Sequence, residues 1–151
     1  MRVLLVGALV TLAVTPAATG ELPAAAVWPR VAHHLDQIGR LTEYFEGVLR
    51  DSCPRFATAG EWDTYLDGEL QRVVLLVAHV EQAWVEAKTT SDDDVRRAAK
   101  APRRRVQEAR GLVDKLAGCA EANGSRLAVS TLWKRVEQDV PRKQAEITLP
   151  R

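Results

Sequence analysis

The sequence predicts an all-α protein folded as an antiparallel, up-down-up-down four-helix bundle. Apolar residues recur at intervals of three and four through four long segments, which is the spacing of one face of an α-helix. No segment alternates apolar and polar residues in the manner of a half-buried strand. The connections between the segments are short, so helices that follow one another in sequence are expected to run antiparallel.

The segment from Glu61 to Thr89 is predicted to be the central helix. Its apolar residues form a stripe between Trp62 and Trp84, and residues 73–78 (VVLLVA) are apolar without interruption. A helix with one neighbour needs only one apolar stripe, so a helix that is apolar on more than one side needs neighbours on at least two flanks. We expect both tryptophans in the core and Trp28, which precedes the first helix, to be exposed.

Residues 1–20 have the pattern of a secretory signal peptide. Arg2 gives a positive start, an apolar run covers residues 3–14, and proline and small residues follow. Cleavage is expected after residue 20, with residue 26 as the latest alternative. The run is shorter than the about 20 residues of a membrane-spanning helix, so an uncleaved anchor is less favoured. We therefore expect a secreted or periplasmic protein without a transmembrane helix once the signal is removed.

The helical bundle is predicted to occupy residues 29–140, after an alanine-rich linker at residues 21–28. Pro29 suits the first turn of a helix, where its missing N–H is not needed. The first helix should continue to about Arg50. The sequence Asp-Ser-Cys-Pro then ends it, because the residue before a proline is pushed out of the helical region.

The third helix is predicted from about Asp92 to Ala122, where Asn-Gly provides a strong stop. Pro102 interrupts it, so the helix is either kinked or broken near this residue. The apolar stripe keeps its phase across the proline, which favours one kinked rod.

The fourth helix is expected to begin at Ser125, as its cap, and to end near Val140. Pro141 marks either the end of this helix or a kink in it; the bundle is assigned to end at residue 140, and residues 141–151 are expected to form a C-terminal tail.

The two cysteines predict one disulfide bond. Cys53 follows the first predicted helix and Cys119 lies near the end of the third, so both fall at the same pole of an antiparallel bundle. An exported protein meets an oxidising compartment, in which such a pair is oxidised. Neither cysteine belongs to a Cys-x-x-Cys motif or has a neighbouring histidine, which argues against metal or haem attachment. Two buried free thiols are the alternative.

No catalytic, metal or cofactor signature is present in the sequence. It contains neither Gly-x-Ser-x-Gly nor Glu-x-x-His, and its only methionine is Met1. A haem site with two histidine ligands would require His34 and His79 to face one another. We therefore predict no catalytic residue, no metal site and no cofactor.

Basic residues on the third helix form a candidate stripe for an anionic partner. Arg96, Arg103 and Arg110 are spaced by seven, so they share one side of a helix, which is expected to point away from the core. The stripe consists of Arg96, Lys100, Arg103, Arg104 and Arg110. The alternative is a solvated face whose charges pair with nearby acids.

An acidic protein surface, lipid head groups or an anionic polymer would suit such a stripe. Nucleic acid is the weakest partner class, because export removes the usual substrate and no aromatic residue interleaves the basic run. The whole chain has 21 basic and 20 acidic residues, so only a local patch can serve this purpose.

These observations predict an exported, non-catalytic helical bundle that acts as a binding or interaction module. A small-ligand or cofactor carrier that uses the bundle interior is the alternative, and an enzyme is a distant third. The hydrophobic fraction of 46% is that of a folded domain. The identity of the partner and the oligomeric state stay open at this stage.

Overall fold

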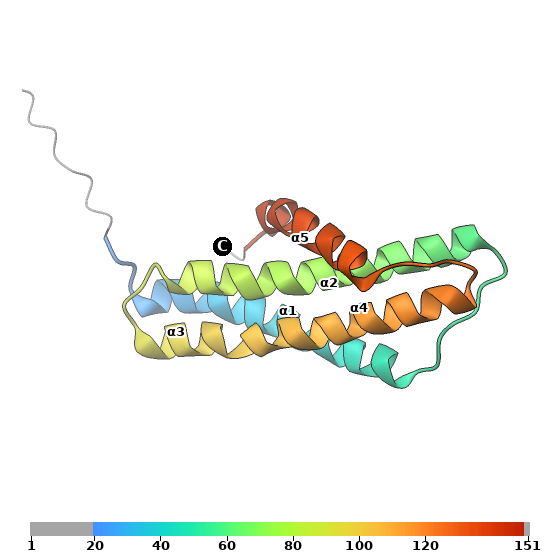
Figure 1. The fold of residues 1–151 in the computed structure, drawn as a ribbon. Coiled ribbons are helices and arrows are strands. Elements are labelled where there is room, and N and C mark those ends of the chain that lie inside the picture. The colour runs from blue at the N-terminus through green and yellow to red at the C-terminus, as the bar shows by residue number, and fades with distance from the viewer. Residues whose placement is uncertain (1–19, 150–151) are drawn as a thin grey trace, which may run out of the picture.

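A computed structural model describes residues 20–149, which form four helical rods and no strand (Figure 1). The all-α prediction is confirmed. The elements are α1 (Ala24–Arg50), α2 (Ala59–Ala87), α3 (Asp93–Lys100), a 3-10 helix η1 (Ala101–Arg104), α4 (Arg105–Ala122) and α5 (Val129–Glu146). We count α3, η1 and α4 as one rod because they follow one another in one direction (Figure 1). The predicted signal peptide lies outside the described residues except for Gly20.

The helix α2 is the one on which all the others pack. It contacts α1, α3, α4 and α5, and its middle is buried on more than one side. Trp62, Val73 and Ala78 have no exposed surface, which confirms the expected core position of Trp62. Its first turn is closed by a capping box, in which Thr58 and Glu61 accept each other's backbone N–H groups.

The helix α1 begins five residues before Pro29, so the expected linker at residues 21–28 is wrong in its second half. Val27 explains the early start, because its side chain is fully buried in a cluster with α2 and α3. Pro29 offers no N–H to the carbonyl of Ala25, but Ala25 is exposed and water can satisfy its carbonyl. Trp28 is 46% exposed, as expected.

Pro102 lies in the 3-10 segment that separates α3 from α4. A proline inside an α-helix removes one backbone hydrogen bond, and a tighter 3-10 turn accommodates this loss over four residues. The rod begins at Asp92, whose carboxylate accepts the N–H of Val95 at 2.9 Å.

The helix α5 starts later and ends later than expected. It begins at Val129 and passes through Pro141 to Glu146, so the predicted end of the bundle at residue 140 is wrong. Its last turn is held by an ion pair between Lys143 and Glu146 at 2.6 Å, while Ile147 packs against the main core. These contacts keep the chain helical beyond the proline.

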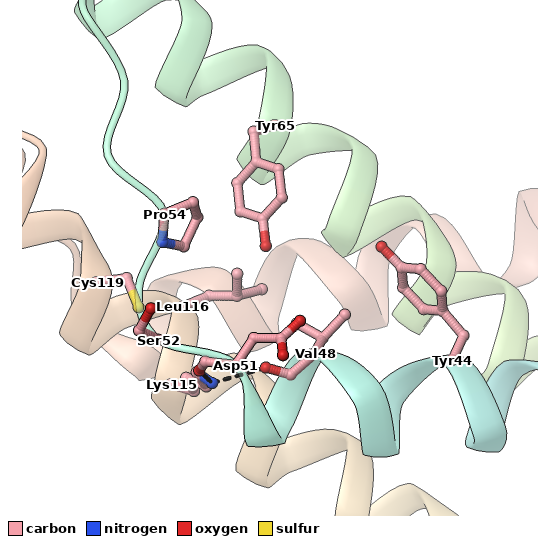
Figure 2. Close-up of a pocket in the computed structure, with 9 residues that line it drawn as sticks. All are labelled: Tyr44, Val48, Asp51, Ser52, Pro54, Tyr65, Lys115, Leu116 and Cys119. Carbon is pink, nitrogen blue, oxygen red and sulfur yellow. Dashed lines mark hydrogen bonds between the residues drawn. The ribbon is translucent and has the colours of Figure 1, made fainter.

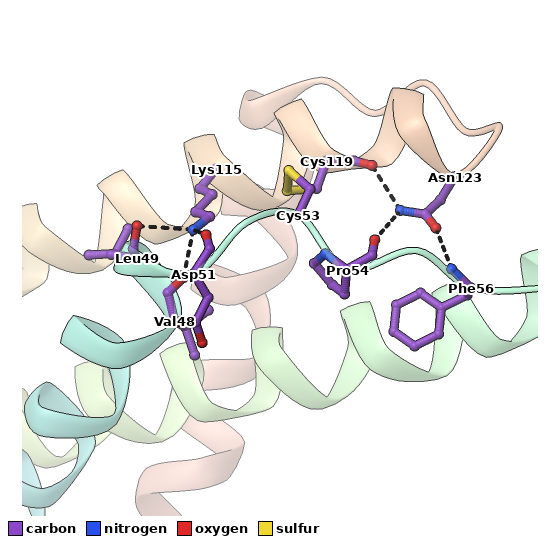
Figure 3. Close-up of a disulfide and its surroundings, with 9 residues drawn as sticks. All are labelled: Val48, Leu49, Asp51, Cys53, Pro54, Phe56, Lys115, Cys119 and Asn123. Carbon is purple, nitrogen blue, oxygen red and sulfur yellow. Dashed lines mark hydrogen bonds between the residues drawn. A yellow bond between two sulfur atoms is a disulfide. The ribbon is translucent and has the colours of Figure 1, made fainter.

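The predicted disulfide bond between Cys53 and Cys119 is present, with 5.4 Å between the two Cα atoms (Figure 3). Two further side chains of α4 hold the same loop. The Lys115 ammonium donates to carbonyls at the end of α1, those of Val48, Leu49 and Asp51. The Asn123 amide donates to the carbonyl of Pro54 and accepts the N–H of Phe56, each at 3.0 Å. One covalent bond and the contacts of two polar side chains therefore hold the α1–α2 connection against α4.

The double substitution Cys53→Ala and Cys119→Ala should lower stability without displacing the loop. Closing a loop of 66 residues stabilises a fold by up to about 4 kcal/mol in the chain-entropy model, while the Lys115 and Asn123 contacts persist in the variant. Urea unfolding followed by circular dichroism measures the loss. Reductant should destabilise the wild type and leave the variant unchanged; equal stability of the two proteins under oxidising conditions would contradict the prediction.

Candidate functional site: an arginine–tryptophan surface on α3 and α4

The predicted stripe lies on the rod formed by α3, η1 and α4, and four of its five members are exposed. Lys100, Arg103, Arg104 and Arg110 are exposed, and Arg96 is half-buried. None of the five forms an ion pair among residues 20–149. Other arginines on the same rod behave differently, since Arg97 pairs with Asp94 at 2.9 Å and Arg105 pairs with Glu108. The charge of the stripe is therefore not neutralised by acids of the described chain.

Two arginines of the stripe lie over tryptophan rings from other helices. The guanidinium carbon of Arg103 is 4.8 Å from the ring centre of Trp84, on α2. That of Arg110 is 4.5 Å from the ring centre of Trp133, on α5. Both distances are within the range of cation–π contacts. These two residues thus lie at the edge of the bundle, beside α2 and α5, where the sequence predicted a side that points away from the core.

Neither of these guanidinium groups donates a hydrogen bond within residues 20–149, so the N–H donors of both are available to a ligand. A guanidinium contacts an aromatic ring through its flat face, whereas its five N–H bonds lie in the plane of the group. Contact with an indole ring restricts the side chains of Arg103 and Arg110, so a ligand that binds them should lose less side-chain entropy. Such a group is suited to a carboxylate or another planar anion.

A hollow adjoins each arginine–tryptophan pair. The Trp84 hollow has a volume of about 620 Å³ and is bounded by Arg103 and by valines of α2 and α4. The Trp133 hollow has a volume of about 530 Å³ and lies between Arg110 of α4 and the beginning of α5. Apolar surface is exposed at both, because Val85 is 50% exposed and Val129 is 38% exposed. Each site therefore combines a cation with apolar walls.

Acidic side chains also border the two hollows. Glu81 lines the Trp84 hollow, and Asp114 and Glu137 line the Trp133 hollow. Glu137 accepts a hydrogen bond from the indole N–H of Trp133 at 2.6 Å, which orients that ring. Positive and negative side chains therefore alternate on this surface, and the surface is not uniformly basic.

The sequence interpretation missed the pairing of the stripe with aromatic rings. It placed Trp84 in the core, but the side chain is half-buried and one side of it remains available to Arg103. Nineteen positions separate these two residues and 23 separate Arg110 from Trp133, so no local motif connects them. The only available signal was the seven-residue spacing of the arginines.

A smaller pocket of about 300 Å³ lies at the disulfide pole (Figure 2). Its polar groups include the hydroxyl of Tyr65, which points into it, and Tyr44, which bounds it. The Tyr44 hydroxyl donates to the buried carboxylate of Glu69 at 2.6 Å, and Arg72 contacts the same carboxylate oxygen. Burial, followed by the hydrogen bond to Glu69, raises the pKa of Tyr44 to about 12. Tyr44 therefore stays protonated and serves as a hydrogen-bond donor.

His34 and His79 face one another in the core, with 2.8 Å between their Nδ1 atoms. Two nitrogens that bind one iron from opposite sides would be about 4 Å apart, given metal–nitrogen bonds of roughly 2 Å. The observed contact is that of a hydrogen bond, so the pair does not enclose a haem iron. Residues 20–149 contain no group of three or more histidine, cysteine or acidic side chains arranged to hold a metal ion.

The histidine pair lies where two parts of the apolar core meet. Along α1, Val31 belongs to one cluster and Ile38 to the other, with His34 between them. Burial lowers the pKa of His34 to about 4, with a smaller contribution from the charge of His33. Burial also lowers the pKa of His79 to about 4, followed by the charges of His34 and His33. Both rings are therefore neutral at pH 7.

Comparisons with protein-family models, curated proteins and solved structures gave no match. None of the helices within residues 20–149 has the length and apolar character needed to cross a bilayer. Functional interpretation therefore depends on the geometry of the described residues.

The buried histidine pair should make stability depend on pH between about 4 and 6.5. The unfolded chain takes up these protons near pH 6.5, whereas the folded protein resists them until about pH 4. The contribution of the pair to stability is therefore complete above pH 6.5 and falls on acidification, by an amount on the order of 3 kcal/mol for the coupled pair. Urea unfolding at pH 7 and pH 4 measures the change.

The substitution His79→Gln provides the control, because glutamine can hydrogen-bond to His34 but does not titrate. The variant should lose a smaller share of its stability between pH 7 and pH 4 than the wild type. Identical pH dependence of the two proteins would show that carboxylates elsewhere dominate the acid response.

Proposed function

We propose that this protein is an exported, non-catalytic interaction module that binds an anionic macromolecular partner through the stripe on α3 and α4. The proposal rests on the surroundings of two arginines, Arg103 and Arg110. Each guanidinium group lies within cation–π distance of an indole ring, and neither forms an ion pair among residues 20–149. Acids line the same hollows, but none of them forms an ion pair with Arg103 or Arg110, so both guanidinium groups can bind an external anion.

Charge around the two pairs supports the same proposal. Lys88 lies over the Trp84 ring at 5.3 Å, so two cations share that ring. Lys100 and Arg104 extend the positive charge along the exposed side of the rod. The members of the stripe supply charge and hydrogen-bond donors, which serve binding and steer association.

The disulfide bond supports export, since such bonds persist in oxidising compartments and are rare in the cytosol. The pattern of residues 1–20, described above, points to the same destination. A secreted or periplasmic location is thus part of the proposal.

A small-ligand carrier is the second candidate function, and the pole pocket is the observation that favours it. The bundle interior is filled by apolar side chains, so the ligand would bind beside Tyr65 at the pole. The pocket volume of about 300 Å³ is at the lower end for ligand sites. The arginine–tryptophan surface offers two larger hollows, and we therefore favour the interaction module.

Retention on immobilised poly-L-glutamate tests the proposed function. The wild-type protein should bind at low salt and elute as salt screens the charges. Replacing Arg96, Arg103 and Arg110 together with Gln should abolish retention. The control replaces three exposed arginines outside the stripe with Gln, namely Arg97, Arg126 and Arg142.

The control changes the net charge by the same amount but leaves both tryptophan pairs intact, so it should stay bound at low salt. Equal elution of the two triple variants would show that only net charge matters and would contradict the proposal. Circular dichroism verifies that both variants fold.

A further inference from the structure

The two arginine–tryptophan pairs lie along one rod of the bundle. Arg103 lies in η1 and Arg110 in α4, seven residues further along the same rod. A rise of about 1.5–2.0 Å per residue separates their backbones by about 10–12 Å along the axis, and two turns of the rod bring them to the same side. Each is supported by a ring from a different helix, Trp84 on α2 and Trp133 on α5. The spacing is thus held by the packing of three helices.

An α-helix is the polypeptide conformation that matches this spacing. Two side chains seven residues apart on a helix also lie about 10 Å apart on one face. In an extended strand, residues three apart span about 10 Å but point to opposite faces, so they cannot both reach the same surface.

The apolar walls of the hollows require apolar groups in the same partner. Val85 and Val129 remain exposed beside the two cations. On a helix, residues three and four positions after the first acidic residue lie on the face between the two acids. Leucine-sized side chains at these positions would cover the exposed valines and enter the hollows.

The acids at the hollows favour a polypeptide over a phosphate polymer. Glu81, Asp114 and Glu137 would repel part of any uniformly anionic chain, so the phosphates of nucleic acid, an anionic membrane surface or poly-L-glutamate should bind more weakly than a polypeptide with spaced acids. A helical peptide can place its carboxylates at the two arginines and uncharged groups opposite these acids.

Resting on the proposed function, we infer that the partner presents an acidic amphipathic helix whose carboxylates, seven residues apart, bind Arg103 and Arg110. The apolar residues between these carboxylates occupy the Trp84 and Trp133 hollows. The docked helix is a helix-in-groove complex with two charge-assisted anchors.

Two labelled synthetic peptides of identical composition test this inference by fluorescence anisotropy with the full chain. The first is a stable helix with two Glu residues seven apart and Leu three and four positions after the first. In the second peptide the second Glu stands five positions after the first, which places it about 140° around the helix from the first Glu. The first peptide should bind at least about tenfold more tightly, the effect of losing one charge-assisted anchor.

Arginine-to-lysine variants test whether binding requires the planar guanidinium group or only its positive charge. Arg103→Lys and Arg110→Lys retain the charge but lose the planar fork and its stacking, so each should weaken binding of the first peptide several-fold. The control Arg97→Lys, on an arginine that contacts neither tryptophan, should leave the affinity unchanged.

Equal affinity for the two peptides would overturn the inference, as would lysine variants that bind the first peptide like the wild type. Stronger competition by anionic vesicles or single-stranded DNA than by unlabelled first peptide would also overturn it. If poly-L-glutamate retention depends on the stripe while the peptides bind alike, the proposed function stands and the helical partner does not. If the triple glutamine variant is still retained, both fail.

Discussion

The helices α1, α3, α4 and α5 all bury apolar surface against α2, whose middle turns are covered on more than one side. Removal of apolar surface from water is the main favourable term in folding, so this shared contact decides where every other helix can lie. The rod of α3 and α4 lies along α2, whereas α5 is inclined to it (Figure 1). The relative positions of Trp84, Trp133 and the two arginines follow from this arrangement.

Polar groups act on the stability of the apolar core at two places. At one they strengthen the fold, and at the other they are expected to weaken it in acid. At the pole, the disulfide bond, Lys115 and Asn123 attach the connection between α1 and α2 to the end of α4. Nearer the other end, His34 and His79 interrupt the core with a buried hydrogen bond whose members resist protonation. One end of the bundle is therefore cross-linked, while the boundary between the two apolar clusters is sensitive to acid.

The candidate site illustrates how a helical bundle can build a binding surface from residues that are ordinary when considered singly. An arginine on a helix surface is usually mobile and pays side-chain entropy when it binds. Here α2 and α5 each supply an indole ring that holds one guanidinium group, so ordering occurs during folding. The exposed valines beside the rings add apolar contact area to the same surface.

The sequence by itself determined the helical class, the central position of residues 61–89 and the pairing of Cys53 with Cys119. These features follow from side-chain periodicity and from helix order, both of which are encoded locally. Only the tertiary structure decided that α1 begins before Pro29, that α5 passes through Pro141, and that arginines of the stripe meet tryptophans. Each of these depends on the rotation and register of one helix against another, because distant contacts stabilise what local propensity disfavours. The spacing of residues along a single helix does not determine how that helix is rotated or shifted against its neighbours.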